Sequence, residues 1–237
     1  MNNFKDIIIE EKKGCKILKL PINSSKENMQ NKKCNYKTLA LMTLYSNISP
    51  DEITLDDGYE ELYRYLYENK IKDSIIEMEK LSHNKQDTIF RNIRKLAKIN
   101  NGLITVTNST KGIIYYINYR STEGGDYVII EEDILKYLID TSNSNVIKVY
   151  ILLKYLCKNG KKSITNEYIA EQIGLCSKSN KNIQSVINII KSLVNNKLIK
   201  KTKDKSVKFK DNKFKYKEIN EYEVVKYEEW KNEMKKI

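Results

Sequence analysis

The 237-residue chain has little proline, glycine, histidine and tryptophan. Two Pro and eight Gly are too few for a low-complexity or disordered protein, and 40% hydrophobic residues suffice for one large or two small cores. The single histidine, His83, excludes the paired-histidine metal site that a rolling-circle nickase needs. Cys15, Cys34, Cys157 and Cys176 form no CxxC pair, so we expect reduced thiols in a cytoplasmic protein rather than a zinc site.

Long hydrophobic runs and glycine-rich nucleotide loops are also missing. No segment approaches the roughly 18 consecutive apolar residues of a membrane span, and residues 1–11 lack the apolar core of a signal peptide. Neither GxxxxGK nor GxGxxG occurs, so no phosphate-binding loop for a nucleotide is visible. The sequence therefore predicts no membrane contact, no cofactor and no metal.

Acidic residues are abundant in 51–80 and 121–133, which leaves a carboxylate-based, magnesium-dependent nuclease as an enzymatic interpretation. These residues lie in evenly charged stretches of expected helix, for which a solvated surface is the simpler explanation. The 17 tyrosines are better explained as core residues than as nucleophiles. We therefore predict that the chain is not an enzyme.

Basic residues are concentrated in one segment. Residues 141–215 hold 17 Lys and no Arg against four acidic residues, a net charge of +13, while the whole chain carries +12. An AT-rich coding sequence explains an excess of lysine, but it does not explain why the lysines gather in one segment. Such a cluster of cations is typical of a surface that neutralises the phosphates of a nucleic acid.

The same segment predicts a winged helix-turn-helix. Apolar periodicity and turn residues indicate helices over 146–157, 165–173 and 180–196, with Thr165 as N-cap of the second helix. A strand over 198–202, a tip over 203–206 and a returning strand over 207–216 follow. Residues 141–216 are therefore expected to form one strongly basic domain with a β-hairpin wing.

The third helix of this segment has two dissimilar sides. A buried stripe is expected from residues that recur at steps of three and four, namely Ile183, Val186, Ile187, Ile190 and Val194. The opposite side carries amides, amines and a hydroxyl, from Lys181, Gln184, Ser185, Asn188 and Lys191. Asn and Gln pair with adenine edges and Lys with guanine or phosphate, which suits a helix in the major groove. A solvated polar face is the alternative.

Residues 36–120 predict a first winged-helix domain with the same order of elements. Helices are expected over 36–48, 59–68, 71–81 and 86–99, the second with a stripe of core tyrosines. Strands are expected over 103–106 and 113–119. In the 86–99 helix, Ile89, Ile93, Leu96 and Ala97 face inward, and the opposite side carries Thr88, Arg91, Asn92 and Lys95.

Three segments flank these domains. Residues 1–35 form a basic arm or linker with a short strand pair over 6–10 and 15–20, and 121–140 form an acidic connector with a strand over 127–130 and a helix over 131–139. Residues 217–237 have the spacing of an amphipathic helix around Trp230. That helix docks on its own domain, forms a dimer contact, or binds a replication protein with Trp230 as anchor.

The run 127–138, followed by 145–155 and the basic winged helix, resembles replication initiators and replisome organisers of plasmids and phages in low-GC Gram-positive bacteria. The resemblance covers about 127–202 and rests on pattern rather than on an invariant motif. It implies binding to an origin of replication, with base readout by Lys181, Gln184, Ser185 and Asn188.

We therefore predict a mainly helical (α+β) cytoplasmic protein in which two tandem winged helix-turn-helix domains bind double-stranded DNA, most simply as a dimer on origin repeats. A winged-helix transcriptional regulator is the alternative, and an assembly scaffold with a protein-binding winged helix is a second one. The predicted DNA-binding residues are Lys178, Lys181, Gln184, Ser185, Asn188 and Lys191 near or on the third helix, Lys203, Lys205, Lys208 and Lys210 on the wing, and Arg91, Asn92 and Lys95 in the first domain.

Overall fold

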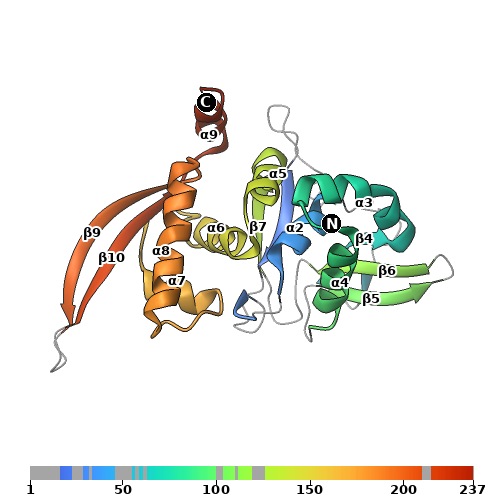
Figure 1. Ribbon diagram of the computed structural model, residues 1–237, viewed down its shortest axis with the longest axis horizontal. Helices are drawn as coiled ribbons and strands as arrows, with labels where there is room; N and C mark the ends of the chain where they lie inside the picture. The colour runs from blue at the N-terminus through green and yellow to red at the C-terminus, as the bar shows by residue number, and fades with distance from the viewer. Residues whose placement is uncertain are drawn as a thin grey trace. The chain divides into compact units, whose positions relative to one another are not determined.

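The computed structural model describes residues 17–22, 29–31, 34–45, 55–56, 59–60, 63–99, 104–109, 112–118, 126–209 and 215–236. The chain forms two compact units, Met1–Ile147 and Lys148–Ile237 (Figure 1). Both units combine helices with small antiparallel sheets, so the fold class is α+β. Within the described ranges, no helix combines the length and the apolar character that crossing a membrane requires.

The first unit builds a three-stranded sheet and several helices. In chain order its main elements are α2 (Tyr36–Tyr45), β4 (Tyr63–Tyr67), α3 (Glu68–Ser82), α4 (Gln86–Ala97), β5 (Ile104–Ser109) and β6 (Gly112–Asn118). The sheet has the order β4-β6-β5, so the last strand lies between the other two. Two short paired strands, β2 (Leu55–Asp56) and β3 (Tyr59–Glu60), precede it.

The core of the first unit surrounds α2. Tyr36, Leu39 and Met42 are each 0% exposed, and eight of the ten residues of α2, from Tyr36 to Leu44 except Lys37, are buried, as expected of a central helix. Helices α3, α4 and α5 (Glu132–Thr141) direct their apolar stripes inward. The buried residues are Ile75 and Met78 in α3, Ile89, Ile93 and Leu96 in α4, and Ile134, Leu135 and Leu138 in α5. The inward stripe expected for the 86–99 helix is thus confirmed for Ile89, Ile93 and Leu96, while Ala97 is half-buried.

A second, two-stranded sheet joins distant parts of the first unit. Strand β1 (Ile17–Ile22) pairs antiparallel with β7 (Asp126–Glu131), with Leu18 opposite Ile130. The range interpreted as an acidic connector therefore contributes β7 and α5 to the fold of the first unit. The partner of β1 is β7, while the expected partner segment, 6–10, lies outside the described residues.

The helix expected over 59–68 is wrong. Residues Tyr63–Tyr67 form strand β4, which pairs with β6 and runs directly into α3 at Glu68. Tyrosines at 63, 65 and 67 alternate with other residues, and aromatic residues favour strands. Their helical spacing was a coincidence of a tyrosine-rich segment, and pairing with β6 decides the conformation.

The second unit combines helices with one three-stranded sheet. Helix α6 (Ser144–Leu156) enters it, and β8 (Lys162–Thr165), α7 (Asn166–Gln172), α8 (Asn180–Asn195), β9 (Ile199–Phe209), β10 (Lys215–Val224) and α9 (Tyr227–Met234) follow. The strand order is β8-β10-β9, and Figure 1 shows β9 and β10 as one long ribbon. Thr165 caps α7 as expected, since its Oγ1 accepts a hydrogen bond of 3.1 Å from the backbone N–H of Tyr168.

The hairpin is longer than the sequence indicated, and the tip expected over 203–206 is wrong. Strand β9 continues to Phe209, with Lys203 opposite Asn220 and Val207 opposite Lys217, and the returning strand begins at Lys215. The polar run at 203–206 resembled a turn, but it contains no Gly, Asn or Pro. Pairing with β10 continues through this run, so the chain does not turn there.

The helix expected over 217–237 is correct only near its end. Residues up to Val224 belong to β10, where alternation places Tyr222 in the core at 0% exposure, and α9 begins at Tyr227. Trp230 is 6% exposed, and Lys200 Nζ in β9 lies 2.7 Å from Glu229 Oε1 in α9. Of the three interpretations of this helix, docking on its own unit agrees with these contacts.

Candidate nucleic-acid interface

Helix α8 is anchored by a buried stripe of Val186, Ile189, Ile190 and Leu193. Val186 and Ile190 confirm the expected stripe, whereas Ile183, Ile187 and Val194 are only half-buried. Ile189 and Leu193 were missed, although they lie at three- and four-residue steps from Val186 and Ile190. The centre of the buried side is therefore rotated slightly from the expected one, and the side opposite to it faces solvent.

The solvent side of α8 carries one polar stripe. Its fully exposed members recur at steps of three and four residues, and they are Lys181, Gln184, Asn188, Lys191 and Asn195. Ser185, also predicted as a binding residue, is half-buried beside this stripe. No acidic residue and no arginine occurs in α8. The helix thus presents hydrogen-bonding amides between lysines, without a carboxylate to repel a phosphate.

Two amides of this stripe bind one another. Gln184 Nε2 donates a hydrogen bond of 3.0 Å to Asn188 Oδ1, one helical turn further on. Each amide group has one oxygen and two N–H donors. The contact leaves Gln184 with its oxygen and one N–H, and it leaves Asn188 with both N–H donors. Because the side chains hold each other, less conformational entropy is lost when either binds a partner.

The turn before α8 is tied to both neighbouring helices. Asn182 Nδ2 in α8 donates to the backbone oxygen of Cys176 at 3.1 Å, and Ser177 Oγ donates to Glu171 Oε1 at 2.5 Å. Lys178 is exposed in this turn, beside the first residues of α8. The contacts fix the entry of the helix, so Lys178 and Lys181 stand near its positive N-terminal end.

The β9–β10 hairpin contains three of the four lysines that the sequence predicts on a wing. Lys203, Lys205 and Lys208 lie in β9, opposite Asn220, Ile219 and Tyr216, and Lys210 lies outside the described residues. At the base of the hairpin, Thr202 Oγ1 donates to Glu221 Oε2 at 3.4 Å, and Lys161 Nζ lies 3.4 Å from the same oxygen. The ladder shifts register between Ile219 and Asn220, which indicates a bulge.

At that bulge, Asn220 is an amide buried without a partner. The residue is 0% exposed in the central strand, and neither Nδ2 nor Oδ1 has a hydrogen-bond partner within the described part of the chain. A neighbouring amide, Asn166, accepts a hydrogen bond of 3.3 Å from Tyr222 Oη. Burial without a partner makes Asn220 a local cost to stability.

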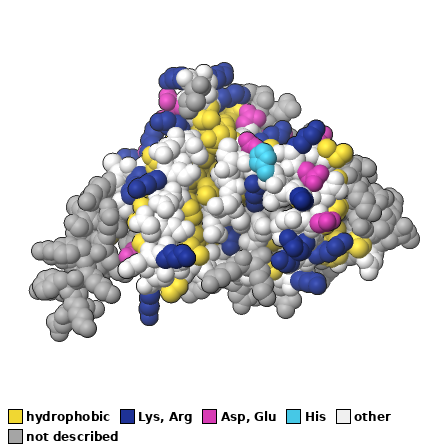
Figure 2. Space-filling view, viewed as in Figure 1, with side chains coloured by type: hydrophobic (Ala, Val, Ile, Leu, Met, Phe, Trp, Pro, Cys, Tyr) yellow, Lys and Arg dark blue, Asp and Glu magenta, His cyan; other side chains and the backbone are white. Residues whose placement is uncertain are grey.

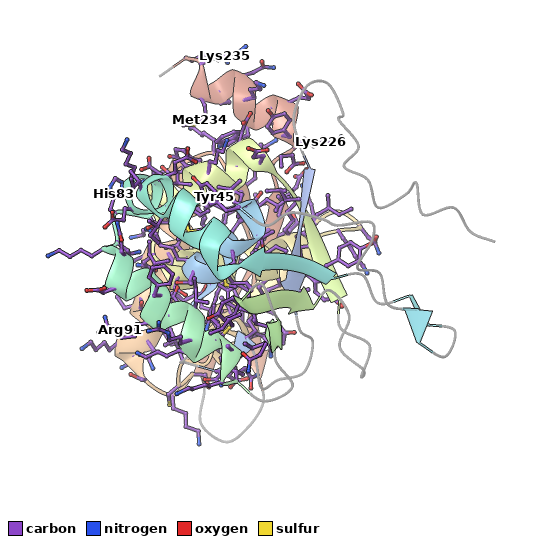
Figure 3. The ribbon with its side chains drawn as sticks, turned by 90° about the vertical axis from the view of Figure 1, so that its right-hand side faces the viewer. Tyr45, His83, Arg91, Lys226, Met234 and Lys235 are labelled. Carbon is purple, nitrogen blue, oxygen red and sulfur yellow. The ribbon has the colours of Figure 1, made fainter. Side chains whose placement is uncertain are left out.

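Helix α4 of the first unit presents a different charged surface. Arg91 and Lys95, both predicted, are exposed, and Arg94 and Lys98 are exposed as well. Figure 2 shows dark-blue side chains gathered over α4, whereas over α8 dark blue alternates with uncharged side chains. Figure 3 shows Arg91 extending away from the ribbon. Asn92 is half-buried. Arg94 and Lys98 were missed, although Arg94 lies three residues after Arg91 and Lys98 four residues after Arg94, a spacing that could have identified them.

The described residues contain no group of three or more His, Cys, Asp or Glu that could hold a metal ion. His83 Nε2, just after α3, lies 2.7 Å from Asp140 Oδ1 of α5, and Figure 3 shows His83 at the end of its helix. Cys157 is buried, and this burial raises the pKa of its thiol above the ordinary value. A raised thiol pKa disfavours the reactive thiolate.

Neither a protein-family model, nor a curated protein, nor a solved structure matches the chain.

Proposed function

We propose that each unit is a winged helix-turn-helix and that the chain binds double-stranded DNA. The proposal is supported by the order in which helices and strands follow one another in the two units. The first unit has α2, β4, α3, α4, β5 and β6 with strand order β4-β6-β5, and the second has α6, β8, α7, α8, β9 and β10 with strand order β8-β10-β9. Apart from the short β2–β3 pair between α2 and β4, both series consist of a helix, a strand, two helices and a hairpin, and the second strand of the hairpin lies in the middle of the sheet.

The observation that carries the proposal is the exposed stripe of α8. An α-helix fits the major groove, and the stripe offers the amides of Gln184 and Asn188 to base edges and lysines to phosphates over about 15 Å of helix from Lys181 to Lys191. The long ribbon of β9 and β10 supplies further lysines for a neighbouring phosphate track. Arg91 and Lys95 of α4 extend the footprint on the DNA.

The biological role we propose is that of a plasmid or phage replication initiator that binds origin repeats. Two units with the same element order are suited to repeated or extended sites, and the resemblance of 127–202 to such initiators points the same way. A homodimer on two repeats follows naturally from this role. A replication protein is the further partner that we expect.

The test begins with capture of DNA fragments from a plasmid and chromosomal library on the purified full chain. Captured fragments are footprinted, and their affinity is measured by fluorescence anisotropy from low to high salt. We expect protection of direct repeats and an affinity that falls with salt, because lysines release counterions from phosphates. Protection of one isolated site at a promoter would instead indicate a transcriptional regulator. Failure to bind any duplex at low salt would overturn the proposed function.

A further inference from the structure

We infer that the Gln184–Asn188 amide pair makes α8 select sites with adenine in the major groove, with Gln184 as the residue that reads it. This inference rests on the proposed function and adds a base preference to it. The observation behind it is the 3.0 Å hydrogen bond from Gln184 Nε2 to Asn188 Oδ1 on the exposed side of the helix.

The bond gives the two amides different roles. Gln184 retains Oε1 as acceptor and one N–H as donor, and adenine presents the complementary N7 acceptor and N6 donor in the major groove. The Oδ1 of Asn188 already accepts one hydrogen bond and keeps one lone pair, whereas both Nδ2 hydrogens remain, so Asn188 acts mainly as a donor. Donors suit thymine O4 or the guanine acceptors. Gln184 therefore specifies adenine, and Asn188 favours a base with a major-groove acceptor.

The spacing along the helix fits this division. Four residues rise about 6 Å, and base pairs rise about 3.4 Å along each strand. The two amides consequently reach base pairs that are about two steps apart. Lys181 and Lys191 lie one turn before Gln184 and one turn after Asn188, where they flank the reading pair.

The other residues of α8 do not compete for this task. The helix lacks Asp and Glu, which accept from cytosine N4, and it lacks Arg, the commonest bidentate partner of guanine. Lysine binds phosphate as a point charge and carries little sequence information there. The amides of Gln184 and Asn188 are therefore the strongest source of base selectivity on the exposed stripe.

The first experiment selects sequences from a library of duplexes with a randomised centre, using wild type, Gln184→Ala, Gln184→Glu, Asn188→Ala and Asn195→Ala. We expect wild type to enrich adenine at a fixed position and Gln184→Ala to reduce that preference by about 5- to 150-fold. Gln184→Glu should change the preferred base there from adenine to cytosine, because a carboxylate only accepts. Asn188→Ala should relax a different position about two steps away.

Asn195→Ala is the matched control, since Asn195 is an exposed amide on the same stripe but lies in the last turn of α8. Its base preferences should equal those of wild type. All substituted side chains are exposed, and far-ultraviolet circular dichroism checks that each variant is folded.

The second experiment replaces the selected adenine with 7-deazaadenine, which removes the N7 acceptor and keeps the base pair. Wild-type affinity should fall by about 5-fold or more, while the affinity of Gln184→Ala should not change further. Duplex binding without adenine enrichment, or equal losses on all sequences for Gln184→Ala, would overturn the inference and leave the proposed function intact. Absence of any duplex binding would overturn both.

Discussion

The two units place helices of opposite chemical character at the same point in their element order. Helix α4 exposes Arg91, Arg94 and Lys95, whereas the exposed stripe of α8 has amides between two lysines. The hairpins differ too, because β5 and β6 have six and seven residues and β9 and β10 have eleven and ten. Lysine and arginine contacts with phosphates add affinity without reading the sequence, whereas amide contacts with base edges add sequence selectivity. We therefore expect the second unit to select sequences and the first to add affinity or contact protein.

The largest expected effects test whether the two helices are anchored alike. Leu193→Ala in α8 and Ile93→Ala in α4 each remove a side chain that is at most 1% exposed. Each should lower the free energy of unfolding of its own unit by about 2–5 kcal/mol, because a cavity is left in the core. Urea unfolding followed by circular dichroism measures this loss. A loss below about 1 kcal/mol in one unit would show that its helix is loosely packed.

Next in size is the contrast between two asparagines. Asn188→Ala, in the exposed stripe of α8, should cost about 1–3 kcal/mol of binding on the selected sequence and nothing on random duplex. Asn92 of α4 is also a predicted DNA-binding residue, but its amide is half-buried, whereas that of Asn188 is exposed, so we expect Asn92→Ala to leave selectivity unchanged. Competition binding with selected and random duplexes measures both values. Equal effects of the two variants would remove the distinction between the units.

The third prediction concerns charge. Replacing Lys203 and Lys205 of β9 together with Ala should weaken binding to all sequences alike and reduce the slope of log affinity against log salt by roughly 1 to 2. The double change Arg91→Ala with Lys95→Ala should reduce the slope similarly. A slope unchanged by the second pair would assign α4 to a protein partner. A slope unchanged by the first would place the wing away from the DNA.

The smallest expected effect lies inside the second unit. Asn220→Leu should raise the free energy of unfolding by about 1 kcal/mol, because the buried amide has no hydrogen-bond partner in the described part of the chain. Asn166→Leu is the control and should lower stability, since it removes the acceptor of the Tyr222 hydroxyl. Thermal unfolding compares the two. Destabilisation by Asn220→Leu would mean that the bulge requires the shape of asparagine.

Local sequence signals predicted much of the second unit. The cap at Thr165, the polar stripe of α8 and the presence of a hairpin all follow from residues close together in the chain. Errors arose where distant pairing decides the conformation. Strand β4 is set by β6, and β1 is set by β7. Tertiary pairing overrides local propensity in such strands.

The candidate site was predictable in composition but not in detail. Helical spacing separated the exposed amides of α8 from its core, yet it could not show that Gln184 donates to Asn188. That bond depends on side-chain rotamers, which sequence periodicity does not specify. Arg94 and Lys98 were detectable in principle, because Arg94 lies three residues after Arg91 on α4 and Lys98, the C-cap of α4, lies four residues after Arg94.

The pairing of β1 with β7 also affects the order in which the chain folds during synthesis. Residues Ile17–Ile22 leave the ribosome well before their partner Asp126–Glu131, which emerges only after the three-stranded sheet and its helices have been made. The apolar side chains of β1, Leu18 and Leu20 among them, must wait for that partner, and long-range closure of this kind is slow. Nascent chains halted before residue 126 should therefore need chaperone protection of this N-terminal strand.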